Sequence, residues 1–232
     1  MNFKRLINNK KRLYDGYKQT YRFFRISDDE IESVENLKDP KIVNEVFNEF
    51  LQEQINGTLQ QGFVYQLGMP SDILKDAGVR DLPIEMASNR LVNKSIQENH
   101  PFNLEEIKGL PNAIQNPLAV FISETVGYSF VVLTELKHGD ENYTAIIGVK
   151  QKPNNNEINS IRSVYYKNLY SIVNWIINGD GEYFCPDFEN RWLIPTKRKL
   201  LSKQQSNSVD VRKQLNIAAN VIKEFGKTSD NQ

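Results

Sequence analysis

The spacing of hydrophobic residues changes near residue 117 of this 232-residue chain. Before that point, apolar residues recur every three or four positions, which is the period of an α-helix. From about residue 118 to 166 they alternate with polar residues, which is the period of a β-strand. The pattern predicts an α+β fold with N-terminal helices, a mainly antiparallel sheet of about four strands, and C-terminal helices.

The helical half predicts three main helices, over residues 3–24, 40–56 and 88–99. The second has the clearest ends, because Asp39 can cap it, Pro40 suits its first turn and Gly57 can end it. Residues 63–68 predict a short strand, residues 70–78 a short capped helix and residues 81–86 an extended segment.

The second half predicts strands over residues 118–122, 128–136, 143–150 and 158–166, with a hairpin turn at 137–140. An amphipathic helix over 168–178, a short strand over 182–185 and a last helix over 210–225 follow. We expect a helical region at 1–58, a main domain at 59–226 and a disordered tail at 227–232.

Charge is unevenly distributed, although the net charge is zero. Residues 1–25 hold eight bases and one acid, whereas residues 26–58 hold nine acids and two lysines. Two interpretations stay open: neighbouring helices with complementary charge, or a basic arm that binds nucleic acid. The candidate nucleic-acid contacts are Lys4, Arg5, Lys10, Lys11, Arg12 and, on the predicted strand over 158–166, Arg162.

The sequence lacks the signatures of several classes of protein. No apolar run approaches the roughly 20 residues that span a bilayer, and the N-terminus has no apolar core of a secretory signal. The single Cys185 excludes an intramolecular disulfide and a cysteine metal cage. No phosphate-binding glycine loop, zinc-protease motif or serine nucleophile elbow occurs. We therefore expect no membrane partner, no metal and no cofactor.

The remaining chemistry is a metal-free set of polar side chains: His100, Lys94, Thr134, Ser163 and Tyr165. Histidine is the side chain best suited to proton transfer near neutral pH, so His100 is either an acid–base group or a structural hydrogen-bond donor. Strand alternation places Ser163 and Tyr165 on one face and Arg162 on the other, unless the strand bulges. His138, in the predicted turn, is expected to be solvated.

Short motifs in fixed order resemble a known family. They are residues 67–74 (starting Leu67-Gly68-Met69-Pro70), 81–84, His100-Pro101-Phe102, Leu110-Pro111, Asn116-Pro117, 132–136 and 161–165. Together they are similar to the phage MuF C-terminal domain, found in polyvalent proteins of phages and conjugative elements and grouped with nuclease toxins of the barnase–EndoU–colicin–RelE fold. The resemblance covers roughly residues 60–226.

The resemblance implies a metal-independent ribonuclease or toxin that cleaves RNA by transphosphorylation. In that hypothesis His100 is the acid or base, Lys94 or Arg162 stabilises charge, and Thr134, Ser163 and Tyr165 are the strand groups of the site. The alternative is a non-catalytic virion cargo or interaction protein on the same fold. The implied partners are RNA, phage virion proteins or an immunity protein, and the implied location is the cytoplasm or the virion.

Overall fold

The computed structural model describes residues 39–91, 103–123, 128–151, 157–202 and 209–229. The predicted helix 3–24, the basic arm, Lys94 and His100 lie outside these residues. The first half contains helix α3 (Pro40–Ile55), strand β1 (Val64–Gln66), helix α4 (Asp72–Asp76), strand β2 (Ile84–Ala87), the 3-10 helix η1 (Leu104–Ile107) and helix α6 (Leu110–Gln115). The second half contains strands β3 (Ala119–Ile122), β4 (Ser129–His138), β5 (Glu141–Gln151) and β6 (Glu157–Lys167), helix α7 (Leu169–Asn178), strand β7 (Gly181–Phe184), the π-helix η2 (Glu189–Leu193) and helices α8 (Ile194–Ser202) and α9 (Val209–Ser229).

The described strands form one mixed sheet in the order β1-β2-β6-β5-β4-β3-β7. All neighbours are antiparallel except β2 and β6, which run parallel. The α+β class is therefore confirmed, but the sheet has seven strands rather than about four. The four predicted strands are β3 to β6, and β1, β2 and β7 extend the sheet at its two sides. These three have only three or four residues each, too few for alternation alone to show that they join the sheet.

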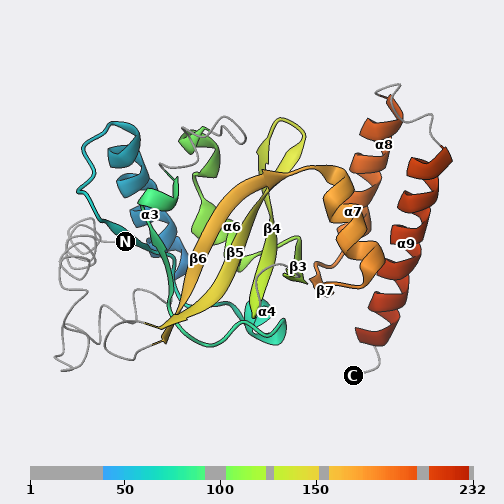
Figure 1. Ribbon diagram of the computed structural model, residues 1–232, viewed down its shortest axis with the longest axis horizontal. Helices are drawn as coiled ribbons and strands as arrows, with labels where there is room; N and C mark the ends of the chain where they lie inside the picture. The colour runs from blue at the N-terminus through green and yellow to red at the C-terminus, as the bar shows by residue number, and fades with distance from the viewer. Residues whose placement is uncertain (1–38, 92–102, 124–127, 152–156, 203–208, 230–232) are drawn as a thin grey trace.

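Helices cover the two faces of the sheet with separate hydrophobic cores (Figure 1). Helices α3, α4 and α6 pack against one face, in a core that includes Tyr143, Ile161 and Val164. Helices α7 and α9 and the π-helix η2 pack against the other, in a core that includes Phe121 and Leu133. We call these the α3 face and the α7 face. None of the described helices combines the length and the hydropathy needed to cross a bilayer.

The ends of helix α3 agree with the sequence prediction. The Asp39 carboxylate accepts a hydrogen bond of 3.0 Å from the backbone N–H of Lys41, and Pro40 occupies the first turn, where no donor is needed. Gly57 follows the helix with φ of +73°, a left-handed conformation that glycine adopts without steric cost. The buried stripe of α3 joins the core beneath the sheet.

The family-like motifs at 67–74 and 110–117 meet in space. The Ser71 hydroxyl donates to the Gln115 carbonyl over 2.8 Å, and the buried Gln115 side chain accepts from the Ser71 N–H over 2.6 Å. The same amide donates to the Leu67 carbonyl over 3.3 Å. These motif residues therefore hold α4 and α6 together, which is a structural role.

At the C-terminus, α9 continues to Ser229, three residues beyond the predicted end of the main domain at 226. Its buried residues Leu215 and Ala218 pack in the α7-face core, so this helix contributes to the fold.

Cys185 is expected to react slowly with thiol reagents in the native protein. It is 4% exposed, and burial is the main cause that raises the pKa of its thiol. The thiolate is the reactive form, so a raised pKa lowers the reactive fraction at pH 7 to 8. We expect Cys185 in the folded chain to react with a chromogenic disulfide at pH 8 at least about 10²-fold more slowly than free cysteine does. In denaturant, one thiol per chain is expected to react. Rapid stoichiometric labelling of the folded chain would contradict this burial.

Candidate nucleic-acid interface

A β-bulge in β6 decides which of its side chains share a face. Ile147 lies opposite Ile161 and Ile146 opposite Ser163, so Arg162 is an extra residue in the strand. Ile161 and Val164, three positions apart, are both buried in the α3-face core. The alternation therefore shifts by one position between them, which leaves Arg162 and Ser163 together on the α7 face. The bulge thus meets the condition under which the sequence allowed Arg162, Ser163 and Tyr165 to share a face.

The position of Arg162 confirms this assignment. A Cβ atom on Gly148 would lie 2.4 Å from Arg162 Nε, so the arginine side chain crosses β5 directly over the glycine. Gly148 follows Ile147, which points into the α3-face core, so Arg162 lies on the opposite face. Its Nη2 donates to the Val149 carbonyl over 3.2 Å. Within the described ranges no carboxylate pairs with Arg162, and the other guanidinium donors remain available.

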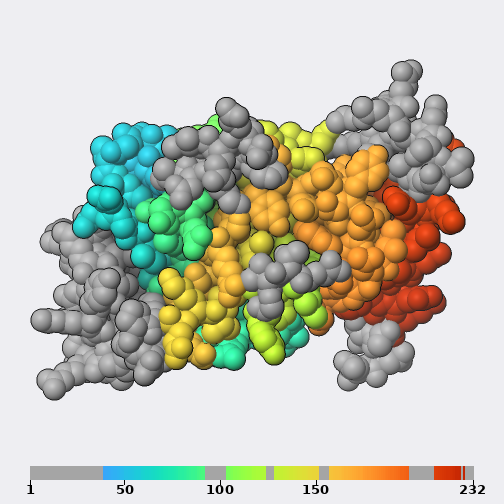
Figure 2. All heavy atoms as spheres, viewed as in Figure 1, coloured from blue at the N-terminus to red at the C-terminus, as the bar shows by residue number. Residues whose placement is uncertain are grey.

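Tyr165 and Lys167 follow Arg162 and Ser163 on the same face of β6 and lead toward α7. We call these four residues the row on β6. The Lys167 ammonium lies 5.7 Å from the centre of the Tyr165 ring and 5.4 Å from that of Trp175 in α7. Burial raises the pKa of the Tyr165 phenol, so this group is a protonated hydrogen-bond donor at neutral pH rather than a base. Arg162, Ser163, Tyr165 and Lys167 span about 15 Å of strand. In Figure 2 the gold and orange atoms of β6 lie next to the orange atoms of α7.

Thr134 is placed differently from the other predicted strand residues. It is fully buried, and its hydroxyl donates to the Tyr143 carbonyl over 2.8 Å. A ligand in solution cannot reach a side chain in that position, so Thr134 stabilises the β4–β5 pairing.

His138 is not simply solvated, as the sequence had suggested. It ends β4, its Nδ1 lies 2.8 Å from Glu106 Oε2, and its ring stacks on Tyr166 with the centroids 4.4 Å apart. The buried Tyr143 hydroxyl donates to the same Glu106 oxygen over 2.7 Å. Burial and the Glu106 carboxylate raise the pKa of that phenol. This cluster fixes η1 to the β4–β5 hairpin on the α3 face, away from Arg162.

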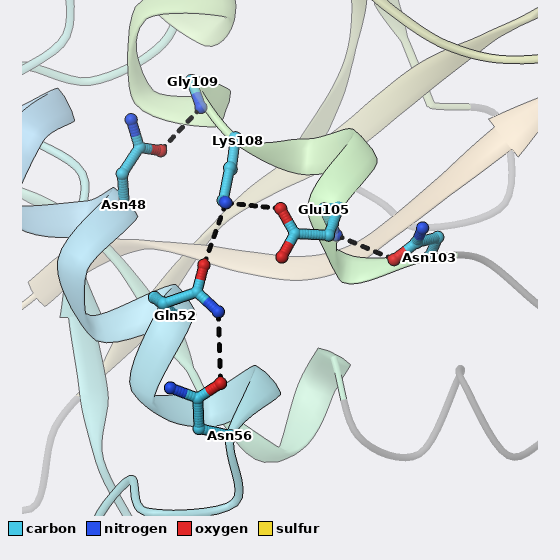
Figure 3. Close-up of polar contacts among 7 residues, drawn as sticks. All are labelled: Asn48, Gln52, Asn56, Asn103, Glu105, Lys108 and Gly109. Carbon is cyan, nitrogen blue, oxygen red and sulfur yellow. Dashed lines mark hydrogen bonds and ion pairs between the residues drawn. The ribbon is translucent and has the colours of Figure 1, made fainter.

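Residues 108 and 109 are anchored to α3 by polar side chains (Figure 3). Asn48 Oδ1 accepts from the Gly109 N–H over 2.8 Å, where Gly109 has the left-handed φ of +81°. Lys108 Nζ donates to Gln52 Oε1 over 3.0 Å and pairs with the Glu105 carboxylate. Asn103 caps η1 by accepting from the Glu105 N–H over 3.0 Å. From Asn103 onward the chain is held firmly at this corner.

A family model described as the phage MuF-C-terminal domain matches residues 91–185. The match takes in η1, α6, strands β3 to β7 and helix α7, including the bulge and the row on β6. It supports the resemblance of this segment to the phage MuF C-terminal family. A search of curated proteins and a search of solved structures each returned no match.

Proposed function

We propose that this phage-related domain binds RNA on the α7 face of β6 and cleaves it without a metal ion, with His100 as the acid–base group. The observation that carries the proposal is the bulge, because it puts one arginine and two hydroxyl donors on the same face. Arg162 has no carboxylate partner within the described ranges, as a phosphate-binding arginine requires. The match to the phage MuF-C-terminal domain model supports a phage-related role for the domain.

The chemistry of such a reaction assigns a role to each group. The ribose 2′-oxygen attacks phosphorus and loses its proton to His100, and the bond from phosphorus to the 5′-oxygen breaks. The 5′-oxygen takes up a proton from solvent, to which His100 afterwards releases the proton that it gained. The products are a 2′,3′-cyclic phosphate and a 5′-hydroxyl. Arg162 or Lys94 neutralises the charge that builds on the phosphate oxygens. Ser163 and the protonated Tyr165 donate hydrogen bonds to those oxygens.

Cleavage of a labelled RNA in excess chelator tests this proposal. General acid–base catalysis contributes about 10²–10⁴-fold, so His100→Ala is expected to slow cleavage by at least about 10² while RNA binding persists. Arg162→Gln is expected to slow cleavage by about 10²-fold through lost charge stabilisation. Arg212→Gln, an exposed arginine of α9 changed in the same way, is the control and is expected to stay within about twofold.

A wild-type chain that leaves every RNA intact would sink the catalytic assignment. The non-catalytic alternative then makes its own prediction, which starts from the eight bases in residues 1–25. Deletion of those residues is expected to abolish association with RNA or a virion protein, and His100→Ala is expected to change nothing. Equal binding by the truncated and full-length chains would exclude the basic arm as the contact.

A further inference from the structure

A cavity of about 330 Å³ lies where β4 begins. Two arginines contribute to its lining. Its wall contains Arg80, Arg162, Tyr128, Asn159 and the backbone around Gly148, and no carboxylate lines it. A hollow of this size and charge suits an anion that carries an organic group. The row on β6 shares only Arg162 with it.

The two arginines are held in different ways. Arg162 crosses Gly148 and is anchored by one hydrogen bond to the Val149 carbonyl. Arg80 pairs with Glu157 over 2.5 Å at the surface, where both side chains are about half exposed. An ion pair in water contributes little, so an anion can draw the Arg80 guanidinium away from Glu157 at small cost. Asn159 donates to the Arg80 and Leu82 carbonyls over 2.7 Å each, which fixes the loop that carries Arg80.

Beside Arg162 lies a buried hydroxyl with no partner among the described residues. Ser129 is 1% exposed, and its Oγ makes no hydrogen bond there. The point where a Gly148 Cβ would stand is 2.6 Å from this Oγ and 2.4 Å from Arg162 Nε, so the two polar groups are neighbours. An unsatisfied buried hydroxyl costs about 1–3 kcal/mol. This hydroxyl therefore neighbours the Arg162 guanidinium, although Ser129 does not itself line the cavity.

Tyr128 supplies an aromatic surface at the same cavity. It is 95% exposed and has a positive φ of 55°, which is uncommon for a residue other than glycine. Backbone strain of this kind costs of order 1–3 kcal/mol and concentrates at ligand sites. An exposed ring beside two arginines is the arrangement that stacks a nucleobase whose phosphate the cations hold.

We propose that this cavity binds a nucleoside phosphate, with the phosphate between Arg80 and Arg162 and the base stacked on Tyr128. This site adds a ligand to the proposed RNA-binding function. The inference rests on that function only for the expectation that the ligand is a nucleotide. The shared chemistry, a phosphate attached to a nucleoside, is found in a free nucleotide and in the 5′ end of an RNA chain. The two sources are separated by the experiment below.

Titration of the full chain with 5′-AMP, adenosine and inorganic phosphate, followed by calorimetry at low salt, tests the site. We expect 5′-AMP to bind at least about tenfold more tightly than adenosine, and binding to weaken as salt rises. Arg162→Gln and Arg80→Gln are each expected to weaken 5′-AMP binding at least about tenfold. Tyr128→Ala is expected to weaken 5′-AMP about 5- to 100-fold and inorganic phosphate less than twofold. Arg212→Gln is expected to bind as the wild type does.

Gly148→Ala offers a second variant that removes no charge. The added methyl group would overlap Arg162 Nε and Ser129 Oγ, so the arginine must leave its position over β5. We expect this variant to lose 5′-AMP binding to the same extent as Arg162→Gln, with circular dichroism unchanged. An unaltered affinity in Gly148→Ala and Arg162→Gln together would overturn the site.

A non-cleavable 2′-O-methyl RNA tetramer with or without a 5′-phosphate identifies the source of the ligand. Tighter binding of the phosphorylated tetramer than of 5′-AMP supports an RNA terminus, and the reverse order supports a free nucleotide. All these measurements are independent of catalysis. Normal 5′-AMP binding without RNA cleavage would end the catalytic proposal alone, whereas cleavage with adenosine binding as tightly as 5′-AMP would end this one alone.

Discussion

Replacement of Phe47 by alanine is expected to lower the free energy of unfolding by about 3–5 kcal/mol. Phe47 lies on α3, has no exposed surface, and its ring centre is 5.1 Å from that of the buried Tyr65. Loss of this ring leaves a cavity in the core that α3 shares with the sheet. Urea denaturation followed by far-ultraviolet circular dichroism measures the change, and the midpoint should fall while the slope stays constant.

Glu53→Ala on the exposed side of the same helix is the matched control, and it is expected to change stability by less than about 0.5 kcal/mol. If Phe47→Ala proved as mild as Glu53→Ala, α3 would not be part of the cooperative core. Loss of the α3 signal alone, with the sheet intact, would instead show that residues 1–58 unfold as a separate unit.

Asn142→Leu is the second change with a large expected effect, a loss of about 2–4 kcal/mol. Asn142 is 2% exposed and joins the sheet to the π-helix η2. Its Nδ2 donates to the Thr134 carbonyl over 2.8 Å, and its Oδ1 accepts from Trp192 Nε1 over 3.1 Å. Leucine has a similar size but leaves both partners buried without a hydrogen bond, and that desolvation outweighs the hydrophobic gain.

Thermal unfolding and the near-ultraviolet circular dichroism of the two tryptophans together report this loss. Asn216→Leu on the exposed side of α9 is the comparison, with a change expected below about 0.5 kcal/mol. A stability of Asn142→Leu equal to that of the wild type would mean that water or a rearranged side chain satisfies Trp192.

Local sequence signals predicted the parts of the fold that local physics determines. The cap of α3 at Asp39 and the hairpin at Gly139, where His138 pairs with Glu141, are both as expected. The parallel pairing of Ile84 with Asn159 joins segments 75 residues apart. No periodicity within either segment specifies that neighbour, which is why the sheet was underestimated.

The candidate interface shows the same limit. Strict alternation predicted that Arg162 and Ser163 lie on different faces of the sheet, because the pattern of polar residues alone does not reveal a bulge. One signal was nevertheless present: Ile161 and Val164 are apolar at a spacing of three, where a regular strand would place them two apart. The Glu106–His138 contact, between residues 32 apart, had no local signal of any kind.

The parallel junction between β2 and β6 also governs how the molecule can open. Strands β3 to β6 form a meander of neighbours in sequence, whereas the segment that leads into β2 is joined to β6 over a long sequence separation, by the pairs at Ile84 and Glu85 and by the hydrogen bonds of Asn159. Release of β2 would carry the Arg80 loop away from Asn159 while the meander kept Arg162 in place. The nucleotide cavity would then close or open with a partial unfolding event, so its affinity would depend on the stability of a sheet margin rather than on the whole domain.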